Sequence, residues 1–152
     1  MKSKAYPTED NLKFLIFSNL RKKIKVKKEI ITTLNAPAPL GPYNQAVKVG
    51  NTLYISGQIP ITADTMELLE GTIKEETQLV MQHLEAILEA SEMNFSNVVK
   101  TSIFLNNMDY FGQVNEVYGG YFDNDTAPAR ETVAVKTLPK GVRIEISMIA
   151  VR

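Results

Sequence analysis

The sequence predicts a single α+β domain in which a mixed β-sheet carries two helices on one face. The first reason is size, because 152 residues of which 44% are hydrophobic suffice for one core. The second is the order of the segments, which reads ββ-α-β-α-ββ. The third is the final segment, residues 142–151, which is apolar on both faces of a strand.

The sheet is predicted to begin with a hairpin. Gly50-Asn51 is a typical hairpin turn signal, and β-type runs flank it on both sides. The segment 35–42 cannot form regular structure because of its prolines and glycine, and a loop follows from Pro60 to Gly71. We expect a short β-like run at residues 29–33 and hairpin strands at residues 46–49 and 53–56.

Apolar residues at helical spacing predict two helices. Thr72 and Glu75 form the Thr-x-x-Glu pattern of a capping box, which marks the start of the first helix. The second helix is expected over residues 109–122, where we interpret the aromatic residues as core rather than as a stacking platform for bases. The two apolar faces are Ile73, Thr77, Val80, Leu84, Ile87 and Leu88 in the first helix, and Phe111, Val114, Val117, Tyr118 and Tyr121 in the second.

Three further strands are expected at residues 98–105, 130–135 and 142–151. Two helices can cover only one face of the sheet, so we infer that an oligomer buries the other. The alternative is a monomer whose second sheet face is partly solvated. In the last strand we place Val142, Ile144, Ile146 and Met148 on one face, and Arg143, Glu145, Ser147, Ile149 and Val151 on the other.

Arg130 and Glu145 are the leading functional candidates. Each lies in or beside an apolar strand, where a charge is costly unless it is paired or works on a ligand. If the two strands are neighbours, the two side chains make a small site for a substrate that bears a carboxylate. The alternatives are a salt bridge from Arg130 to Glu145 or Glu131, and an exposed strand glutamate at position 145.

Composition excludes several kinds of chemistry. The chain has no cysteine, which rules out disulfides, thiolate nucleophiles and cysteine-ligated metals. Its single histidine, His83, cannot supply a histidine pair for a metal, and we interpret it as structural or solvent-facing. No apolar run approaches 18 residues, so we expect no membrane span. A reducing compartment is compatible with these features, and we expect a cytoplasmic protein.

Residues 1–27 differ from the rest in charge. Residues 1–28 contain nine Lys or Arg and two Asp or Glu, whereas the remainder contains eight and fifteen. Helical signals from Thr8 to Leu20 precede the basic run 21–28. The order of charges disfavours a secretory signal, and the composition fits a transit peptide badly. A membrane- or nucleic-acid-binding arm is possible, as is an accessory, partly helical or poorly ordered extension to the domain of residues 28–152.

Residues 28–152 resemble the RidA (YjgF) family of reactive-intermediate deaminases. The matching strings are Asn35-Ala36-Pro37-Ala38-Pro39-Leu40-Gly41-Pro42-Tyr43, Ser56-Gly57-Gln58-Ile59-Pro60, Val114-Asn115-Glu116-Val117-Tyr118, Pro128-Ala129-Arg130, Leu138-Pro139 and Ile144-Glu145-Ile146. They follow one another in the family's order across the whole domain. The resemblance implies a chorismate-mutase-like (YjgF) fold and a homotrimer with a barrel-like centre and clefts between subunits. It also implies hydrolysis of 2-imino or 2-enamino acids, such as 2-aminoacrylate, to 2-keto acids and ammonia without cofactor or metal.

The same resemblance assigns roles to individual residues. Arg130 would grip the substrate carboxylate through two parallel hydrogen bonds. Glu145 would orient the attacking water or shuttle a proton, and Tyr43 would donate a proton or hydrogen bond unless it only packs at an interface. Pocket-lining roles fall to Ser56 and Gly57, which could otherwise simply end a strand, and to Asn115, which could otherwise cap or bridge subunits.

Two departures from the family pattern bear on activity. Thr132 stands where many members have cysteine, and it can replace that residue if the position works through its backbone carbonyl. Ser147 replaces an acidic residue, which changes the local charge but not the carboxylate of Glu145.

Two other functions stay open. Family members are also described as translation-inhibiting endoribonucleases (L-PSP), although here only the basic extension offers positive charge to a nucleic acid. A carboxylate-binding or chaperone-like trimer without turnover is the third possibility.

Overall fold

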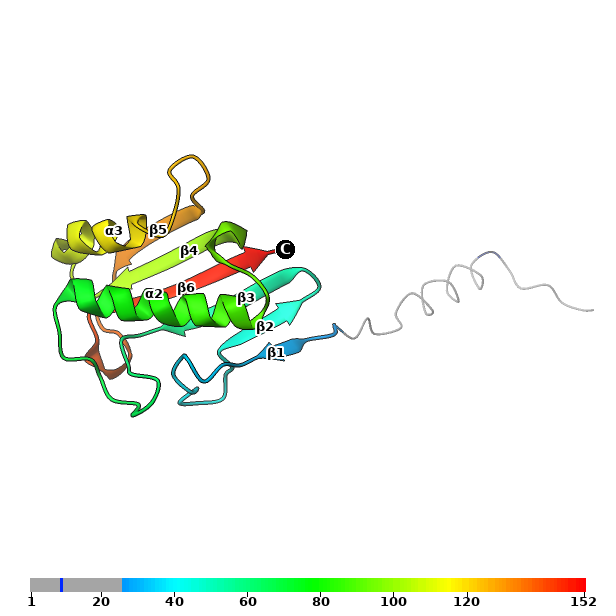
Figure 1. Ribbon diagram of the computed structural model, residues 1–152, viewed down its shortest axis with the longest axis horizontal. Coiled ribbons are helices and arrows are strands. Elements are labelled where there is room, and N and C mark those ends of the chain that lie inside the picture. The colour runs from blue at the N-terminus through cyan, green and yellow to red at the C-terminus, as the bar shows by residue number, and fades with distance from the viewer. Residues whose placement is uncertain (1–8, 10–25) are drawn as a thin grey trace, which may run out of the picture.

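The computed structural model describes residue 9 and residues 26–152 (Figure 1). Apart from residue 9, the helix expected over residues 8–20 lies outside these residues, as does most of the predicted extension 1–27. The described chain forms one six-stranded sheet with two helices, and the predicted α+β class and element order are confirmed. The strands are β1 (Glu29–Ile31), β2 (Ala46–Val49), β3 (Thr52–Gln58), β4 (Val98–Leu105), β5 (Ala129–Ala134) and β6 (Ile144–Val151), and the helices are α2 (Ile73–Ala90) and α3 (Phe111–Gly119).

The strand order is β1-β2-β3-β6-β4-β5. Strand β5 pairs parallel with β4, because α3 carries the chain back along the sheet before β5 begins. All other strand pairs are antiparallel. Strand β6 inserts between β3 and β4, which leaves β5 at the edge. The strands that carry Arg130 and Glu145 are therefore not neighbours, and that prediction is wrong.

Helix α2 begins at the predicted capping box. The Thr72 hydroxyl accepts a hydrogen bond from the Glu75 N–H at 3.3 Å, and the Glu75 carboxylate accepts one from the Thr72 N–H at 2.6 Å. Val80, Leu84 and Ile87 are fully buried against the sheet. Burial of each such side chain contributes about 1.5–3 kcal/mol, so the apolar stripe of α2 holds the helix on the sheet.

Helix α3 is shorter than the predicted 109–122. A 3₁₀ turn, η2 (Met108–Tyr110), precedes it, and the side chain of Asn107 caps this turn by accepting from the Asp109 N–H at 2.9 Å. The helix ends at Gly119 and is followed by a second glycine, which favours termination. The shorter helix still places one face against the sheet, with Val114 and Tyr118 buried.

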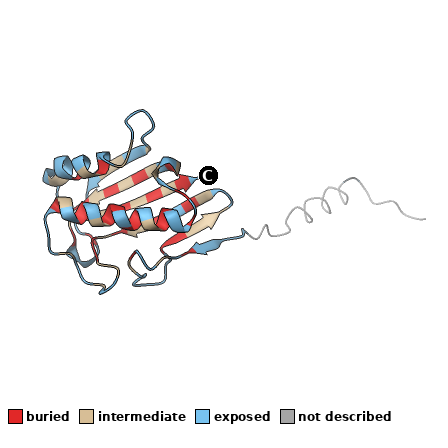
Figure 2. Ribbon diagram, viewed as in Figure 1, coloured by how far each residue is buried: buried red, intermediate tan, exposed pale blue. Residues whose placement is uncertain are grey.

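Both helices lie on the same face of the sheet (Figure 1). Along β6, buried residues alternate with half-buried ones (Figure 2). Ile144, Ile146 and Met148 point toward the helices, whereas Glu145 and Ser147 lie on the opposite face. No helix in the described part of the chain covers that second face. The oligomer inferred to cover it stays a prediction.

Candidate active site

Glu145 lies in a cavity of about 450 Å³ together with Tyr43, Ser56 and Gly57. These are four of the residues that the sequence singles out. They come from β6, from β3 and from the loop before β2, so the strand order β2-β3-β6 brings them together. The other lining residues are Leu40, Ile59, Pro139 and Lys140.

The Glu145 carboxylate lies directly against the backbone of Gly57. A Cβ atom at position 57 would lie 1.8 Å from the nearer carboxylate oxygen, so only glycine leaves room for this side chain. The contact occurs at an irregularity of β3, where the pairing with β6 shifts between Ile55 and Gln58. Irregularities in strand pairing can redirect the side chains next to them.

Burial raises the pKa of Glu145 above its ordinary value. Among the described residues, none donates a hydrogen bond to its carboxylate, which therefore remains available to accept a proton. A carboxylate with a raised pKa is a stronger base than an exposed one. The Tyr43 hydroxyl accepts from the Leu40 N–H at 3.2 Å and keeps its own proton for a ligand.

Gln45 holds the proline-rich loop that forms one wall of this cavity. Its side-chain amide nitrogen donates to the carbonyls of Thr33, Ala36 and Pro37 at 2.9–3.0 Å. Its side-chain oxygen accepts from the Thr33 N–H at 2.7 Å. Sequence reasoning missed this residue. The available signal was a loop whose prolines leave carbonyls that need donors from elsewhere, next to a glutamine.

Arg130 lies in a second cavity, of about 350 Å³, on the helix side of the sheet. One of its terminal nitrogens donates to the Asn115 side-chain oxygen at 2.8 Å. Its guanidinium carbon also lies over two aromatic rings, 4.9 Å from the ring centroid of Tyr118 and 5.9 Å from that of Phe111. The remaining guanidinium N–H groups have no partner among the described residues. They are free to bind a carboxylate.

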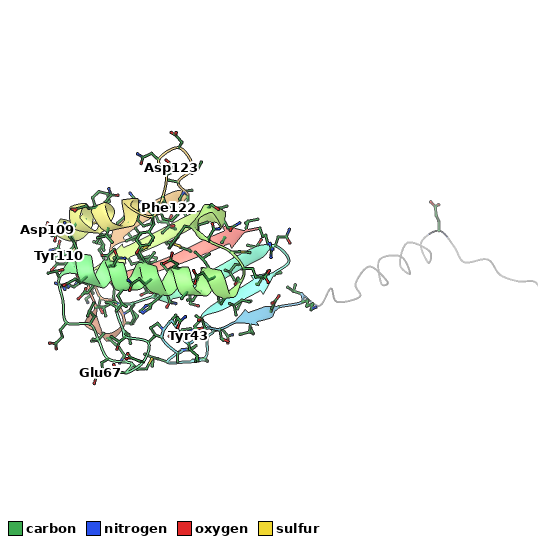
Figure 3. The ribbon with its side chains drawn as sticks, in the orientation of Figure 1. Tyr43, Glu67, Asp109, Tyr110, Phe122 and Asp123 are labelled. Atoms are coloured by element: carbon green, nitrogen blue, oxygen red, sulfur yellow. The ribbon has the colours of Figure 1, made fainter. Side chains whose placement is uncertain are left out.

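Arg130 and Glu145 do not share a cleft within one chain. Arg130 is in register with Thr101, whose side chain faces the helices, whereas Glu145 is in register with Phe104 on the open face. Strand β4 separates the two. Figure 3 shows Tyr43 and Phe122, which line the two cavities, at opposite edges of the sheet. The two side chains therefore make no common site within one chain, and the cleft between subunits that the resemblance implies stays a prediction.

The remaining candidates on β5 occupy different positions. Thr132 faces the helices in register with Ile103, and its buried hydroxyl has no hydrogen-bond partner among the described groups. Glu131 faces the opposite side, where its carboxylate accepts from Lys100 and Ser102. These two hydrogen bonds lower the pKa of Glu131. Within the described region, neither Glu131 nor Glu145 pairs with Arg130, so both alternative salt bridges are wrong.

Two further titratable residues, His83 and Arg143, contribute to the packing of the domain and not to either of the two cavities. His83 is 2% exposed, and burial lowers its pKa to about 4. Arg143 was expected on the face of Glu145, but it precedes β6 and binds the Glu76 carboxylate of α2 through two nitrogens, the closer contact at 2.6 Å. Hydrogen bonding to Glu76 raises the pKa of Arg143. The reason is that regular strand alternation starts only at Ile144.

The described residues contain no group of three His, Cys, Asp or Glu side chains arranged to hold a metal ion. None of their helices combines the length and apolarity that crossing a membrane requires.

A family model, a known protein and two solved structures each match most of this chain. The family model Endoribonuclease L-PSP matches residues 33–152. The chain is 46% identical over 124 residues to the 2-iminobutanoate/2-iminopropanoate deaminase of Dermatophagoides farinae, covering 82% of this chain and 96% of that protein. It matches the structure of RidA from the Antarctic bacterium Psychrobacter sp. with a TM-score of 0.78 and 42% identity, covering 82% and 99% of the two chains. It matches the structure of E. coli TdcF with bound serine with a TM-score of 0.76 and 36% identity, covering 82% and 98%.

Proposed function

Because the chain belongs to the Endoribonuclease L-PSP family, which includes imine deaminases, we propose that it hydrolyses 2-imino and 2-enamino acids. The products are a 2-keto acid and ammonia. The observation that carries the proposal is the pair of complementary cavities. One holds a half-buried carboxylate without a partner in the described chain, and the other holds a guanidinium with free N–H groups.

The proposed reaction uses few groups. Arg130 binds the substrate carboxylate through its free N–H groups, and this fixes the imine carbon relative to the protein. Glu145 accepts a proton from a water molecule whose oxygen adds to that carbon. Glu145 then returns this proton to the nitrogen of the resulting carbinolamine. The C–N bond breaks as the carbinol hydroxyl gives its proton back to the Glu145 carboxylate, so that the carbonyl of the keto acid forms and ammonia leaves. The free hydroxyl proton of Tyr43 is available to hydrogen-bond the departing nitrogen.

The separation of Arg130 from Glu145 supports a site shared between subunits. Each chain carries both the cavity of Arg130 and the cavity of Glu145, but within that chain the two lie apart. A second chain can bring its own Arg130 next to the Glu145 of the first. The face that carries Glu145 also lacks a covering helix in the described residues, and Tyr54 on this face is 50% exposed. We therefore propose a homotrimer in which Arg130 of one subunit faces Glu145 of the next.

A coupled assay tests the reaction. A serine dehydratase generates 2-aminoacrylate, and the rate of pyruvate formation is followed with and without the protein. The proposal requires a rise in this rate that scales with the amount of added protein. An unchanged rate over a range of imino acids of different size would contradict it.

RNA cleavage is the second candidate, and the description of the matching family model favours it. Its requirements fit poorly, because residues 29–152 have a net charge of −7 and therefore repel a phosphate backbone. The only histidine is buried with a lowered pKa, which leaves no imidazole pair for acid–base cleavage. Cleavage of RNA that survives the substitution Glu145→Gln would favour a separate ribonuclease site.

A further inference from the structure

Helix α3 presents three side chains to Arg130 at the spacing i, i+4 and i+7. These are Phe111, Asn115 and Tyr118, which lie on one helical face. Asn115 contributes one hydrogen bond, and the two aromatic residues contribute ring contacts. The orientation of Arg130 is therefore set from the helix and not by its neighbours along β5.

Tyr118 differs from the other two because it is anchored in the interior. It is 4% exposed, whereas Phe111 and Asn115 are exposed. Its hydroxyl donates to the Thr101 hydroxyl oxygen at 3.1 Å. Thr101 is fully buried on β4 and is the residue in register with Arg130 on β5. Tyr118 therefore connects the Arg130 guanidinium to Thr101, the residue that pairs with Arg130 between β4 and β5.

We propose that Tyr118, anchored by Thr101, is a positioning residue that fixes the Arg130 guanidinium for the substrate carboxylate. The inference rests on the proposed function for its kinetic consequence, but not for its geometry. An exposed arginine has many rotamers, and a single hydrogen bond to Asn115 leaves rotation free. A fixed ring within cation–π distance of the guanidinium restricts that freedom, while the N–H groups not bonded to Asn115 stay available for a two-pronged contact.

The test compares Thr101→Val with Thr101→Ser in the full-length chain. Valine keeps the size but removes the acceptor of the Tyr118 hydroxyl, and serine keeps the acceptor. Tyr118→Phe removes the donor while keeping the ring, and Tyr121→Phe is the matched control, because Tyr121 bonds Gln78 and not Thr101. Each variant is measured for KM, kcat, thermal stability and the Nε–H NMR signal of Arg130. The chain has four arginines, so loss of one signal in Arg130→Lys assigns it.

Positioning predicts that Thr101→Val and Tyr118→Phe shift the Arg130 signal toward that of a free arginine. KM should rise about three- to tenfold with kcat within about twofold of wild type, since ground-state and transition-state binding weaken together. Thr101→Ser and Tyr121→Phe should change neither the signal nor KM. If Thr101→Val and Tyr118→Phe leave signal and KM unchanged, or lower only kcat, the inference is overturned. If wild type hydrolyses no imine but the signal still shifts, the proposed function fails while the positioning contact stands.

Discussion

Adding one methyl group at Gly57 should strongly lower activity without unfolding the protein. The Cβ atom of Gly57→Ala would lie 1.8 Å from a carboxylate oxygen of Glu145 and 2.8 Å from its Cγ atom. To reach the 3.4 Å at which ordinary contact begins, that oxygen must withdraw by about 1.6 Å. Gly57 has no positive φ, so alanine introduces no backbone strain at this position.

The magnitude follows from that displacement. A misplacement of about 1 Å of a reacting group can cost about 100-fold in rate. We therefore expect kcat of Gly57→Ala to fall by at least about 100-fold in the coupled 2-aminoacrylate assay. The backbone N–H of residue 57 and the charge of Glu145 are both retained, so the loss would reflect the position of the carboxylate.

Gly112→Ala is the matched control. Gly112 lies on α3, has no positive φ, and a Cβ atom there would meet nothing within 4 Å. Its kcat should equal that of wild type, and both variants should keep the melting temperature within a few degrees. Wild-type kcat in a folded Gly57→Ala protein would refute the assigned role of Glu145.

Four other predictions concern Arg130, Glu145, His83 and residues 1–27. Arg130→Ala should lose imine hydrolysis but stay folded, and Arg130→Lys should also hydrolyse imines slowly, because an ammonium group cannot make the two parallel hydrogen bonds of a guanidinium. Near-normal turnover in either variant would remove Arg130 from the site. Glu145→Gln should bind carboxylate ligands normally but hydrolyse slowly, and in wild type kcat/KM should fall as the pH drops through the raised pKa of Glu145, a limb that the variant should lack. The pKa of His83 is lowered to about 4, so the folded state disfavours its protonated form. The free energy of unfolding should therefore hold above about pH 6.5 and fall by up to about 3 kcal/mol toward pH 4. NMR titration of this single histidine checks the pKa, and an ordinary value near 6.5 would contradict its burial. A chain that starts at Lys28 should keep full deaminase activity but lose salt-sensitive retention on RNA or anionic vesicles; loss of hydrolysis would show that residues 1–27 pack on the domain.

The elements of the fold could be predicted because their signals are local. The Thr72 capping box, the Gly50-Asn51 turn and the alternation from Ile144 to Ala150 each depend on a few adjacent residues. The strand order is different, because the pairing of β6 with β3 and β4 joins residues about 40 to 100 positions apart. Nothing in the segment 142–151 indicates which strands will flank it.

The candidate site could be predicted only in part, because the positions of its residues also depend on pairing between distant segments. Arg130 and Glu145 could be recognised as charges in or beside apolar strands, but their faces depend on the register with β4. Tyr118 fits the apolar stripe of α3, so its contact with Arg130 had no separate sequence signal. The role of Gln45 depends on carbonyls 8 to 12 residues away, which only the folded loop brings within reach.

Subunit complementation tests the shared site most directly. Arg130→Ala and Glu145→Gln chains should each be nearly inactive, but each retains the functional residue that the other lacks. If equal amounts are dissociated and reassembled at random, about one site in four combines an intact Arg130 with an intact Glu145. The mixture should therefore recover about a quarter of wild-type activity, with mixed assemblies verified by native mass spectrometry. Background activity in verified mixed assemblies would contradict a site built from two chains.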